Sequence, residues 1–490
     1  MQPQQHAEPR EGLGLRDYQL DLLARVRQSL RTDQRVICQA PTGAGKTALA
    51  VYMMGRAAER GMRSMFLVHR RELIEQTSRA LWEQRLAHGL IVSGKGGSKL
   101  PSQVASVQTL VRRLDRYDEP DLIIIDEAHR AAAATYQRIL DAYPRAKVVG
   151  LTATPERTDG RGLDHLFSDI QCGPPLGWLI EQGWLSDYTA YAPSNIDLSG
   201  THTRAGDYVR DELEAAVDKP SITGDAVDHY RRVAMGRRAI AFCVSRKHAE
   251  HVAAQFTAEG IAAECVTGLT PDAQRRGALA RFREGKTLIL VGVDLFIEGL
   301  DVPAAEAAIL LRPTQSLIVH MQALGRVLRT APGKERAIIL DHVGNLTRPG
   351  LGLPDQPREW TLEGRGPRKR KSDDESDIQV RQCPECFHVH KPAAVCPGCG
   401  HVYEANGREI EQRDGELVEL DQAAIRRERK RAQGKARTVD DLIRLGVERG
   451  MKDPGGWAAH VSAARQGRKA TTEEKSEARK SARGLKEAAL

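Results

Sequence analysis

The stretch Ala40–Thr47 reads Ala-Pro-Thr-Gly-Ala-Gly-Lys-Thr and lies between an apolar run, Arg35–Gln39, and a helical pattern. A glycine-rich loop in this position presents backbone N–H groups and a helix N-terminus, which together bind polyphosphates. Lys46 can reach the β- and γ-phosphates, and the Thr47 hydroxyl can ligate Mg²⁺. The strict form of this phosphate-binding loop motif begins with glycine, whereas this chain has alanine at that position, residue 40. The residues predicted to bind ATP in this loop are Thr42, Gly43, Ala44, Gly45, Lys46 and Thr47.

Two carboxylates follow the next strongly apolar run. Leu122–Ile125 leads into Asp126-Glu127-Ala128-His129, which places both acids at the carboxyl end of a buried strand, where open α/β sheets bind their ligands. We predict that Asp126 holds Mg²⁺ through water and that Glu127 is the general base that positions the attacking water. A solvated acidic pair at a strand end is the alternative interpretation.

Between Leu15 and Asp341 short β-branched runs alternate with helical patterns, which predicts βαβ units around parallel sheets. The first block of expected strands is Arg35–Gln39, Met65–His69, Val104–Val107, Leu122–Ile125 and Val148–Leu151. The second block is Ala239–Val244, Ala262–Val266, Thr287–Val291, Ala307–Leu311 and Ala337–Leu340. The less periodic stretch 188–236 is expected to carry the connection and the opening helix of the second block. The predicted fold class is α/β, with two tandem lobes.

Further motifs occur in a fixed order along both blocks, and together they resemble a superfamily 2 helicase or translocase of the DEAD/DEAH-box type. The segments that carry the resemblance, besides the two above, are Leu15–Gln19, Phe66–Leu73, Val107–Leu110, Leu151–Pro155, Phe242–Arg246, Val291–Asp294, Glu298–Pro303 and Gln322–Arg329. The resemblance implies two RecA-like P-loop lobes with ATP and Mg²⁺ bound in the cleft between them.

Residue roles carried over from the resemblance fall into three groups. Arg16 and Gln19 would contact the adenine. The other nucleotide contacts would come from Glu298, Gly299 and Asp301. The catalytic set would be Lys46, Asp126, Glu127, Gln322, Arg326 and Arg329, in which the two arginines are arginine-finger candidates, a role worth roughly 10³ to 10⁵ in rate; a basic surface helix is the alternative. The residues implied to couple ATP to nucleic acid are Arg70, Arg71, Gln108, Thr109, His129, Thr152, Thr154, Ser245 and Asp294.

The predicted function is an ATP-dependent DNA helicase or translocase, because binding and release of ATP between two lobes that both grip a nucleic-acid backbone can drive stepping. The opening motif, the Asp-Glu-Ala-His box and the Glu-Gly-Leu-Asp-Val-Pro segment look closer to repair, restriction-subunit and phage motors than to RNA-specific DEAD-box proteins. The alternatives are a double-strand translocase that does not separate strands, an RNA helicase, and a non-stepping ATP-gated clamp or recruitment subunit.

Four clustered cysteines predict a metal site. Cys383-Pro-Glu-Cys386 and Cys396-Pro-Gly-Cys399 form two C-x₂-C knuckles nine residues apart, a spacing suited to a structural Zn²⁺ in a zinc ribbon. A disulfide pair or a redox motif is the alternative. The ribbon could contact DNA, contact a protein partner or support the structure. The other cysteines, Cys38, Cys172, Cys243 and Cys265, are expected to be buried thiols.

Composition sets the remaining expectations. The chain has 490 residues, a formal charge of +8 and a pI near 9.0, a balance that favours polyanionic partners without proving them. We expect a cytoplasmic protein, because neither a signal sequence nor a membrane-spanning run is apparent. From residue 426 onward, 18 Lys and Arg stand against 9 Asp and Glu. The expected organisation is a flexible N-terminus (1–12), two lobes (13–187 and 188–350), a charged linker (351–380), the ribbon (381–405) and a helical, basic tail (406–490).

Overall fold

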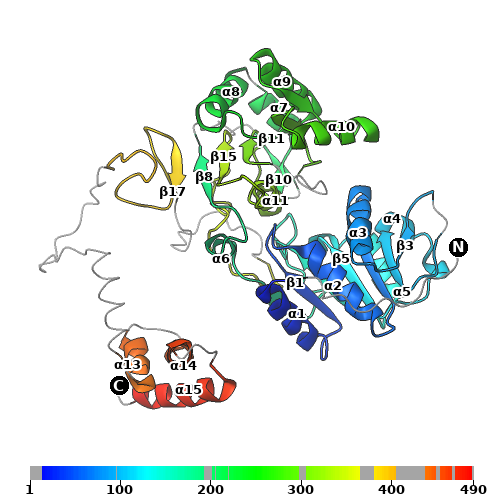
Figure 1. Cartoon of the computed structure of the whole chain (residues 1–490), viewed down its shortest axis with the longest axis vertical. Helices are drawn as coiled ribbons and strands as arrows, with labels where there is room; N and C mark the ends of the chain where they lie inside the picture. The colour runs from blue at the N-terminus through cyan, green and yellow to red at the C-terminus, as the bar shows by residue number, and fades with distance from the viewer. Residues whose placement is uncertain are drawn as a thin grey trace, which may run out of the picture. The chain divides into compact units, whose positions relative to one another are not determined.

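The computed structural model describes residues 14–94, 97–192, 201–204, 206–218, 220–296, 305–364, 380–403, 436, 438–448, 453–465 and 470–487. They belong to two compact units, residues 1–405 and residues 406–490. None of the helices within these ranges is long and apolar enough to cross a membrane. Two lobes and a small cysteine-containing hairpin make up the first unit (Figure 1).

The first lobe is a seven-stranded, entirely parallel sheet in the order β3-β4-β2-β5-β6-β1-β7. Its strands are β1 (Arg35–Gln39), β2 (Ser64–Val68), β3 (Gly89–Ile91), β4 (Ser102–Ser106), β5 (Leu122–Asp126), β6 (Lys147–Thr152) and β7 (Asp169–Cys172). Its helices are α1 (Asp17–Ser29), α2 (Lys46–Ala58), α3 (Arg71–Glu83), α4 (Val107–Leu110), α5 (Ala134–Ala142) and α6 (Leu176–Glu181), with short 3₁₀ turns at Leu114–Arg116 and Ala128–Arg130.

Successive side chains of each strand point to opposite faces of this sheet, and helices pack on both faces, as is usual for a parallel sheet. In β2, Phe66 and Val68 join the core that contains α1, α2 and α3, whereas Met65 and Leu67 join the core that contains α5. The five strands predicted for this block are confirmed within two residues at each end. β3 and β7 were not predicted because β3 has only three residues and no residue of β7 is fully buried.

The second lobe is an eight-stranded sheet in the order β12-β13-β11-β14-β15-β8-β17-β16. Its strands are β8 (Tyr188–Tyr191), β11 (Ala239–Phe242), β12 (Ala263–Cys265), β13 (Ile289–Gly292), β14 (Ala307–Leu310), β15 (Ala337–Asp341), β16 (Arg381–Gln382) and β17 (His388–His390). A separate two-stranded hairpin consists of β9 (Thr203–Arg204) and β10 (Asp207–Tyr208). The helices are α7 (Arg210–Val217), α8 (Pro220–Ala234), α9 (Arg246–Ala258), α10 (Asp272–Arg283) and α11 (Leu317–Val327).

β8 joins the cysteine-rich hairpin to the second lobe. It pairs in parallel with β15 on one side and antiparallel with β17 on the other, so β16 and β17 extend the sheet of the lobe (Figure 1). The Gln382 side chain also donates a hydrogen bond to the Ala192 carbonyl. The five strands predicted for the second block are present, but the stretch expected to be connection contains the additional strand β8.

The beginning of the predicted charged linker is packed rather than extended. Leu351 and Leu353 are buried in the core that spans both lobes, and Leu362 is buried in the other core of the first lobe, the one that contains α5. The Leu163 N–H donates to the Leu362 carbonyl at 2.6 Å. Residues 351–364 therefore depart from the expectation of a linker, because their apolar side chains tie the second lobe back to the first; residues 365–379 lie outside the described residues.

The second unit consists of α13 (Val439–Glu448), α14 (Pro454–Arg465) and α15 (Thr472–Glu487). Leu442 and Ile443 from α13 pack with Ala458 and Ala459 from α14 and with Ala478 from α15. The described part of the tail, which was expected to be helical, is thus made of helices. Small alanines at the contacts allow three short helices to share a core.

Candidate nucleotide site and interlobe cleft

The loop after β1 has the backbone geometry of a phosphate cradle. Gly43 and Gly45 have φ values of 87° and 86°, a left-handed conformation that glycine adopts without steric cost. α2 begins at Lys46, so its N-terminal N–H groups face the loop. Ala40 has no positive φ, which explains why a Cβ is tolerated where the strict pattern has glycine.

Gln19 is attached to this loop from α1. Its amide nitrogen donates to the Ala44 carbonyl at 2.7 Å, and its amide oxygen accepts from the Arg16 N–H at 3.0 Å. The Tyr18 hydroxyl donates to the same Ala44 carbonyl at 3.1 Å. Both ends of the Gln19 amide are therefore bonded to protein, and the predicted contact with adenine stays a prediction.

The carboxylates Asp126 and Glu127 lie at the end of β5. Burial, and secondly the neighbouring Glu127, raise the pKa of Asp126 to about 7, while the charges of Lys46 and Arg326 act in the opposite direction. Glu127 has φ 50°, a left-handed conformation that is costly for a residue with a Cβ and that clusters at functional sites. Lys46 thus acts on Asp126 from the same lobe and Arg326 from the other.

His129 connects this acidic pair to β6. Its Nδ1 lies 3.4 Å from a Glu127 carboxylate oxygen and 3.4 Å from the Thr152 hydroxyl. The Thr152 hydroxyl donates to the Thr154 carbonyl at 2.9 Å and accepts from the Thr154 N–H at 3.2 Å. A buried polar chain therefore runs from Glu127 to the loop after β6.

α11 brings the second lobe against the phosphate loop. A Cβ built at Gly325 would overlap the Thr42 side chain, so the backbone of α11 packs directly against that side chain. The Gln322 side chain is 3% exposed, and neither its amide nitrogen nor its oxygen bonds to any described residue. The Thr42 hydroxyl is also buried without such a partner. Arg329 packs near Gly43, and burial lowers its pKa.

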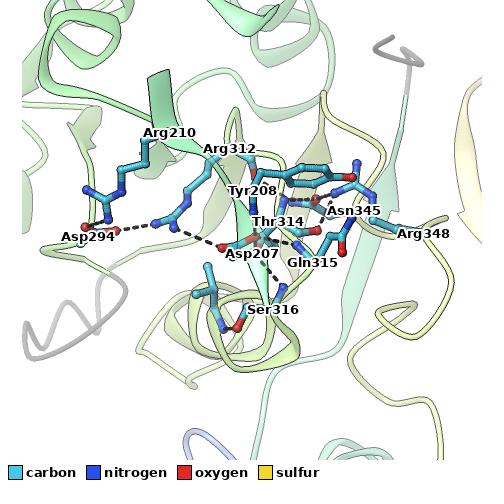
Figure 2. Close-up of polar contacts among 11 residues, drawn as sticks. Asp207, Tyr208, Arg210, Asp294, Arg312, Thr314, Gln315, Ser316, Asn345 and Arg348 are labelled. Carbon is cyan, nitrogen blue, oxygen red and sulfur yellow. Dashed lines mark hydrogen bonds and ion pairs between the residues drawn. The ribbon is translucent and has the colours of Figure 1, made fainter. Parts of the chain in front are cut away.

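Several predicted coupling residues meet in a cleft of about 520 Å³ between the lobes. Arg70 and His129 line it from the first lobe and Asp294 from the second, where Arg210 and Arg312 bind the Asp294 carboxylate (Figure 2). The remaining basic residues of the lining are Arg130 and Arg157. The cleft is therefore predominantly basic.

The other predicted coupling residues lie elsewhere or are not described. Gln108 and Thr109 lie on α4, and Ser245 caps α9 by accepting a hydrogen bond from the His248 N–H. The Arg71 side chain and the whole of Glu298, Gly299 and Asp301 fall outside what the structure describes. Their predicted roles stay predictions.

The four clustered cysteines form one compact sulfur cluster. Their Sγ atoms all lie within 4.8 Å of one another, and the Cys383–Cys399 and Cys386–Cys396 separations are 3.6 Å. All four are free thiols, so the disulfide alternative is not what the structure contains. The residue after each second cysteine, Phe387 or Gly400, has a positive φ of 59° or 77°, which turns both knuckles in the same way.

Family models match both lobes. Residues 12–157 match the model described as Type III restriction enzyme, res subunit, and residues 221–331 match the Helicase conserved C-terminal domain. The chain belongs to the superfamily 2 helicases. For this helicase the predicted class of activity, ATP-dependent and coupled to nucleic acid, is confirmed.

Individual relatives agree with this assignment. The helicase is 33% identical over 392 residues to the 51.5 kDa protein of Lactococcus phage (isolate 7-9), covering 79% of this chain and 83% of the phage protein. It is 30% identical over 357 residues to the putative ATP-dependent helicase IRC3 of Saccharomyces cerevisiae, covering 67% of this chain and 51% of the yeast protein. The helicase therefore spans about half the length of the yeast protein.

A solved structure supports the fold. The fragment structure of a putative HsdR subunit of a type I restriction enzyme from Vibrio vulnificus YJ016 superposes with a TM-score of 0.54 at 23% identity, covering 68% of this chain and 66% of that chain. The two RecA-like lobes predicted for the helicase are confirmed by this likeness and by its own parallel sheets.

Sequence reasoning missed several residues of the cleft. Arg312 follows β14 and so lies at the carboxyl end of a parallel strand, the same signal that identified Asp126. Arg130 directly follows one recognised motif and Arg157 lies two residues after another, so both could have been found in that way. Arg210 of the cleft and Asp207, which contacts the cleft residue Arg312, belong to the non-periodic stretch before α8, where no sequence pattern marks them in this helicase.

Proposed function

We propose that this helicase is a DNA motor whose lobes close on ATP and reopen after hydrolysis, so that the protein steps along its track. The observation that carries the proposal is the meeting of the two lobes at the phosphate loop. Gly325 of α11 lies against Thr42, and the charge of Arg326 acts on Asp126. A site assembled from both lobes converts a change in the bound nucleotide into a relative movement of the lobes.

The residues present suit MgATP. Buried polar groups without partners are rare in folded proteins, and the Thr42 hydroxyl of the loop and the Gln322 amide of α11 are two such groups. Phosphate oxygens or an ordered water would satisfy both. Mg²⁺, when bound, neutralises charge on the phosphate oxygens, and Thr47 and Asp126 are the residues that would hold it.

Each remaining polar residue has a defined task in this proposal. Lys46 binds the β- and γ-phosphates. Glu127 orients the attacking water and accepts its proton, and its left-handed backbone conformation directs the carboxylate from the strand end. Arg326 and Arg329 stabilise the charge that develops on the γ-phosphate.

The chain from Glu127 through His129 to Thr152 and Thr154 is the proposed route from chemistry to track. Loss of the γ-phosphate changes what Glu127 contacts, and the His129 ring lies between that carboxylate and the Thr152 hydroxyl, 3.4 Å from each. His129 also lines the basic cleft, where arginines can bind backbone phosphates in a salt-dependent manner. A rearrangement at Glu127 would thereby move His129 in the basic cleft, where nucleic acid would lie.

DNA is the proposed track. The sequence motifs are closer to those of restriction and repair motors than to RNA-specific DEAD-box proteins, and the first-lobe match to a restriction-enzyme subunit supports the same choice. Movement along duplex DNA without strand separation is compatible with this proposal as well as unwinding.

Steady-state ATPase measurements test the proposal. Turnover is measured with single-stranded, duplex and forked DNA and with RNA, for the native protein and for Glu127→Gln. We expect stimulation by DNA above that by RNA, and a Glu127→Gln protein that binds ATP without turnover. Equal turnover with and without every nucleic acid would sink the proposal, as would full translocation by a Lys46→Ala protein that lacks ATPase activity.

We further propose that the four cysteines hold one structural Zn²⁺. Sulfur atoms around a tetrahedral ion with Zn–S bonds of about 2.3 Å lie about 3.8 Å apart, close to the 3.6 Å separations of the two sulfur pairs. Four cysteines leave no coordination position for catalysis. Because β17 pairs with β8, the ion would stabilise the edge of the second-lobe sheet. Native mass spectrometry should find one zinc per chain, and metal-free protein would contradict this.

A further inference from the structure

A small hairpin of the second lobe reaches the first lobe beside the cleft. β9 and β10 pair antiparallel, with Asp207 opposite Arg204 and Tyr208 opposite Thr203. The hairpin lies in residues 158–220, between the two segments that match family models. At its turn Gly206 has φ 86°, and a Cβ built there would overlap the Thr158 carbonyl of the first lobe. The hairpin therefore touches the loop that follows Thr152 and Thr154.

The carboxylate of Asp207 is the polar anchor of this hairpin. It accepts hydrogen bonds from the Thr314 hydroxyl at 2.9 Å and from the Gln315 N–H at 2.8 Å, and it lies 3.4 Å from the Arg312 guanidinium. Its side chain is 16% exposed and that of Arg312 10% exposed, so both charges are largely removed from water. Figure 2 shows Asp207 between Arg312 and the residues that precede α11.

One of these partners, Thr314, fixes the beginning of α11. The Thr314 hydroxyl accepts from the Ser316 N–H at 3.0 Å, and the Ser316 side chain caps α11 by accepting from the Val319 N–H. α11 is the helix that carries Gln322 and Arg326. A displacement of Asp207 would therefore alter the start of the helix that faces the phosphate loop.

The third partner leads into the basic cleft. Arg312 contacts Asp207 with one nitrogen and Asp294 with the other, and Arg210 binds Asp294 from α7. Although burial alone would raise it, the charges of Arg312 and Arg210 lower the pKa of Asp294. Alternating charges thus run from the hairpin to Asp294, one of the residues implied to couple ATP to nucleic acid (Figure 2).

A row of buried, alternating charges such as this one contributes little to the stability of the fold by itself. Removing paired charges from water costs about as much as their attraction returns, and well-packed apolar side chains often stabilise a fold better. A carboxylate with three partners in fixed directions does, however, hold one geometry. Asp207 binds a hydroxyl, a backbone N–H and a guanidinium at once. The first two groups precede α11, the helix that faces the phosphate loop, and the guanidinium lines the basic cleft. A motor must connect these two sites.

We propose that Asp207 is a positioning residue that couples the nucleic-acid cleft to the ATP site, with the β9–β10 hairpin as the contact through which movement of the first lobe reaches α11. The inference rests on the proposed function, because it concerns how hydrolysis responds to DNA. It names a residue and a segment for which the superfamily motifs provide no role.

Gly206→Ala tests the interlobe contact, and Gly236→Ala is its matched control. Both glycines have positive φ, 86° and 80°, so both substitutions strain the backbone, but no atom lies near the Cβ position of Gly236. Only Gly206→Ala forces the hairpin away from Thr158. We expect it to lower DNA-stimulated ATP turnover about tenfold, within the usual range of coupling energies, and to raise the ATP consumed per base pair in a triplex-displacement assay. Turnover without DNA and the KM for ATP should change less than about twofold.

Asp207→Asn tests the carboxylate itself and preserves its size. The control is Asp187→Asn, which removes an exposed carboxylate from an ion pair with Arg336 in the same lobe. Asp207→Asn should lower DNA-stimulated ATP turnover and raise the ATP consumed per base pair, as Gly206→Ala does. Asp187→Asn should behave as the native protein. Combining Asp207→Asn with Arg312→Gln should add little to the single changes, because residues that act through one contact are not additive.

The outcomes separate the inference from the proposed function. Native protein that shows no response to DNA overturns the proposed function and the inference with it. Native stimulation with an unchanged ATP-per-base-pair ratio in Gly206→Ala or Asp207→Asn overturns the inference alone. Parallel loss of basal and stimulated turnover would mean an ordinary structural role and would also overturn it. If Asp207→Asn fails to fold, the comparison of Gly206→Ala with Gly236→Ala decides.

Discussion

Gly325 of the second lobe lies so close to Thr42 of the phosphate loop that a Cβ at position 325 would overlap the threonine side chain. The two residues are 283 positions apart in the chain, and their contact is where the lobes meet at the nucleotide. Only glycine, which has no Cβ, allows a side chain to approach the helix backbone this closely. The contact makes the width of the interface at the phosphate loop sensitive to a single methyl group.

Gly325→Ala should therefore hold the lobes apart. Misplacement of catalytic groups by about 1 Å can reduce the rate about 10²-fold, and we expect kcat to fall by about this factor while the first lobe still binds ATP. The control is Gly55→Ala in α2, where no atom lies near the Cβ position. An unchanged kcat in Gly325→Ala would contradict closure at this contact.

Arg326→Ala should remove charge stabilisation at the γ-phosphate. Its guanidinium acts on Asp126 across the lobe interface, and arginine fingers contribute about 10³-fold or more to kcat. Arg276, an exposed arginine of α10, provides the control substitution to alanine. Rapid-quench measurement of one turnover locates the loss in the chemical step; a loss confined to ATP binding would argue against the assigned role.

The buried carboxylate of Asp126 predicts a pH dependence of stability. Its pKa is raised to about 7, so the folded protein holds a proton that the unfolded chain releases near pH 4. The stabilising contribution is complete below the unfolded pKa and is lost as pH rises through about 7. In the absence of Mg²⁺ and ATP, the midpoint of thermal unfolding should fall over this interval, and Asp126→Asn should reduce the slope.

MgATP should restore the stability that the native protein loses as pH rises through about 7. The reason is that Mg²⁺ replaces the proton as the positive charge at the Asp126 carboxylate. A slope that is the same in Asp126→Asn and in the native protein would show that another group titrates. Differential scanning calorimetry from pH 5 to pH 8 gives both results.

Sequence patterns located the glycine-rich loop and the acidic strand end better than the residues around them. Lys46, Asp126 and Glu127 are recognisable because glycines and acids end strongly apolar strands, and such strands dominate the local pattern. Asp207 and Arg312 are brought together by a two-residue strand pair and a loop, and neither has periodicity. Leu362 was hidden for another reason: the stretch around it is rich in charge and glycine, yet one leucine is enough to pack against Leu163.

The ribbon illustrates the same limit. The two C-x₂-C knuckles predicted that four cysteines come together, and the structure contains that cluster, but the attachment of the ribbon to the second lobe depends on pairing between β17 and β8. Backbone pairing of short strands far apart in the chain leaves little trace in side-chain pattern. Local chemistry was therefore predictable, and long-range docking was not.

The docked ribbon predicts that metal loss weakens the second lobe. Cys383→Ser should lower the unfolding midpoint by a few degrees, since about 1 kcal/mol corresponds to roughly 2–4 °C in a domain of this size. Cys172→Ser, which alters a half-buried free cysteine in β7, is the control. Hydrogen exchange at β8 should increase in Cys383→Ser only; unchanged protection of β8 would mean that the ribbon docks without supporting the sheet.

The dependence of ATP turnover on duplex length tests stepping most directly. A motor that moves along DNA hydrolyses more ATP per binding event on longer tracks, so turnover at saturating DNA should rise with length and then reach a plateau. Glu127→Gln should show no turnover at any length. A native rate that is stimulated by DNA but independent of its length would contradict stepping and would identify a clamp that only switches its affinity.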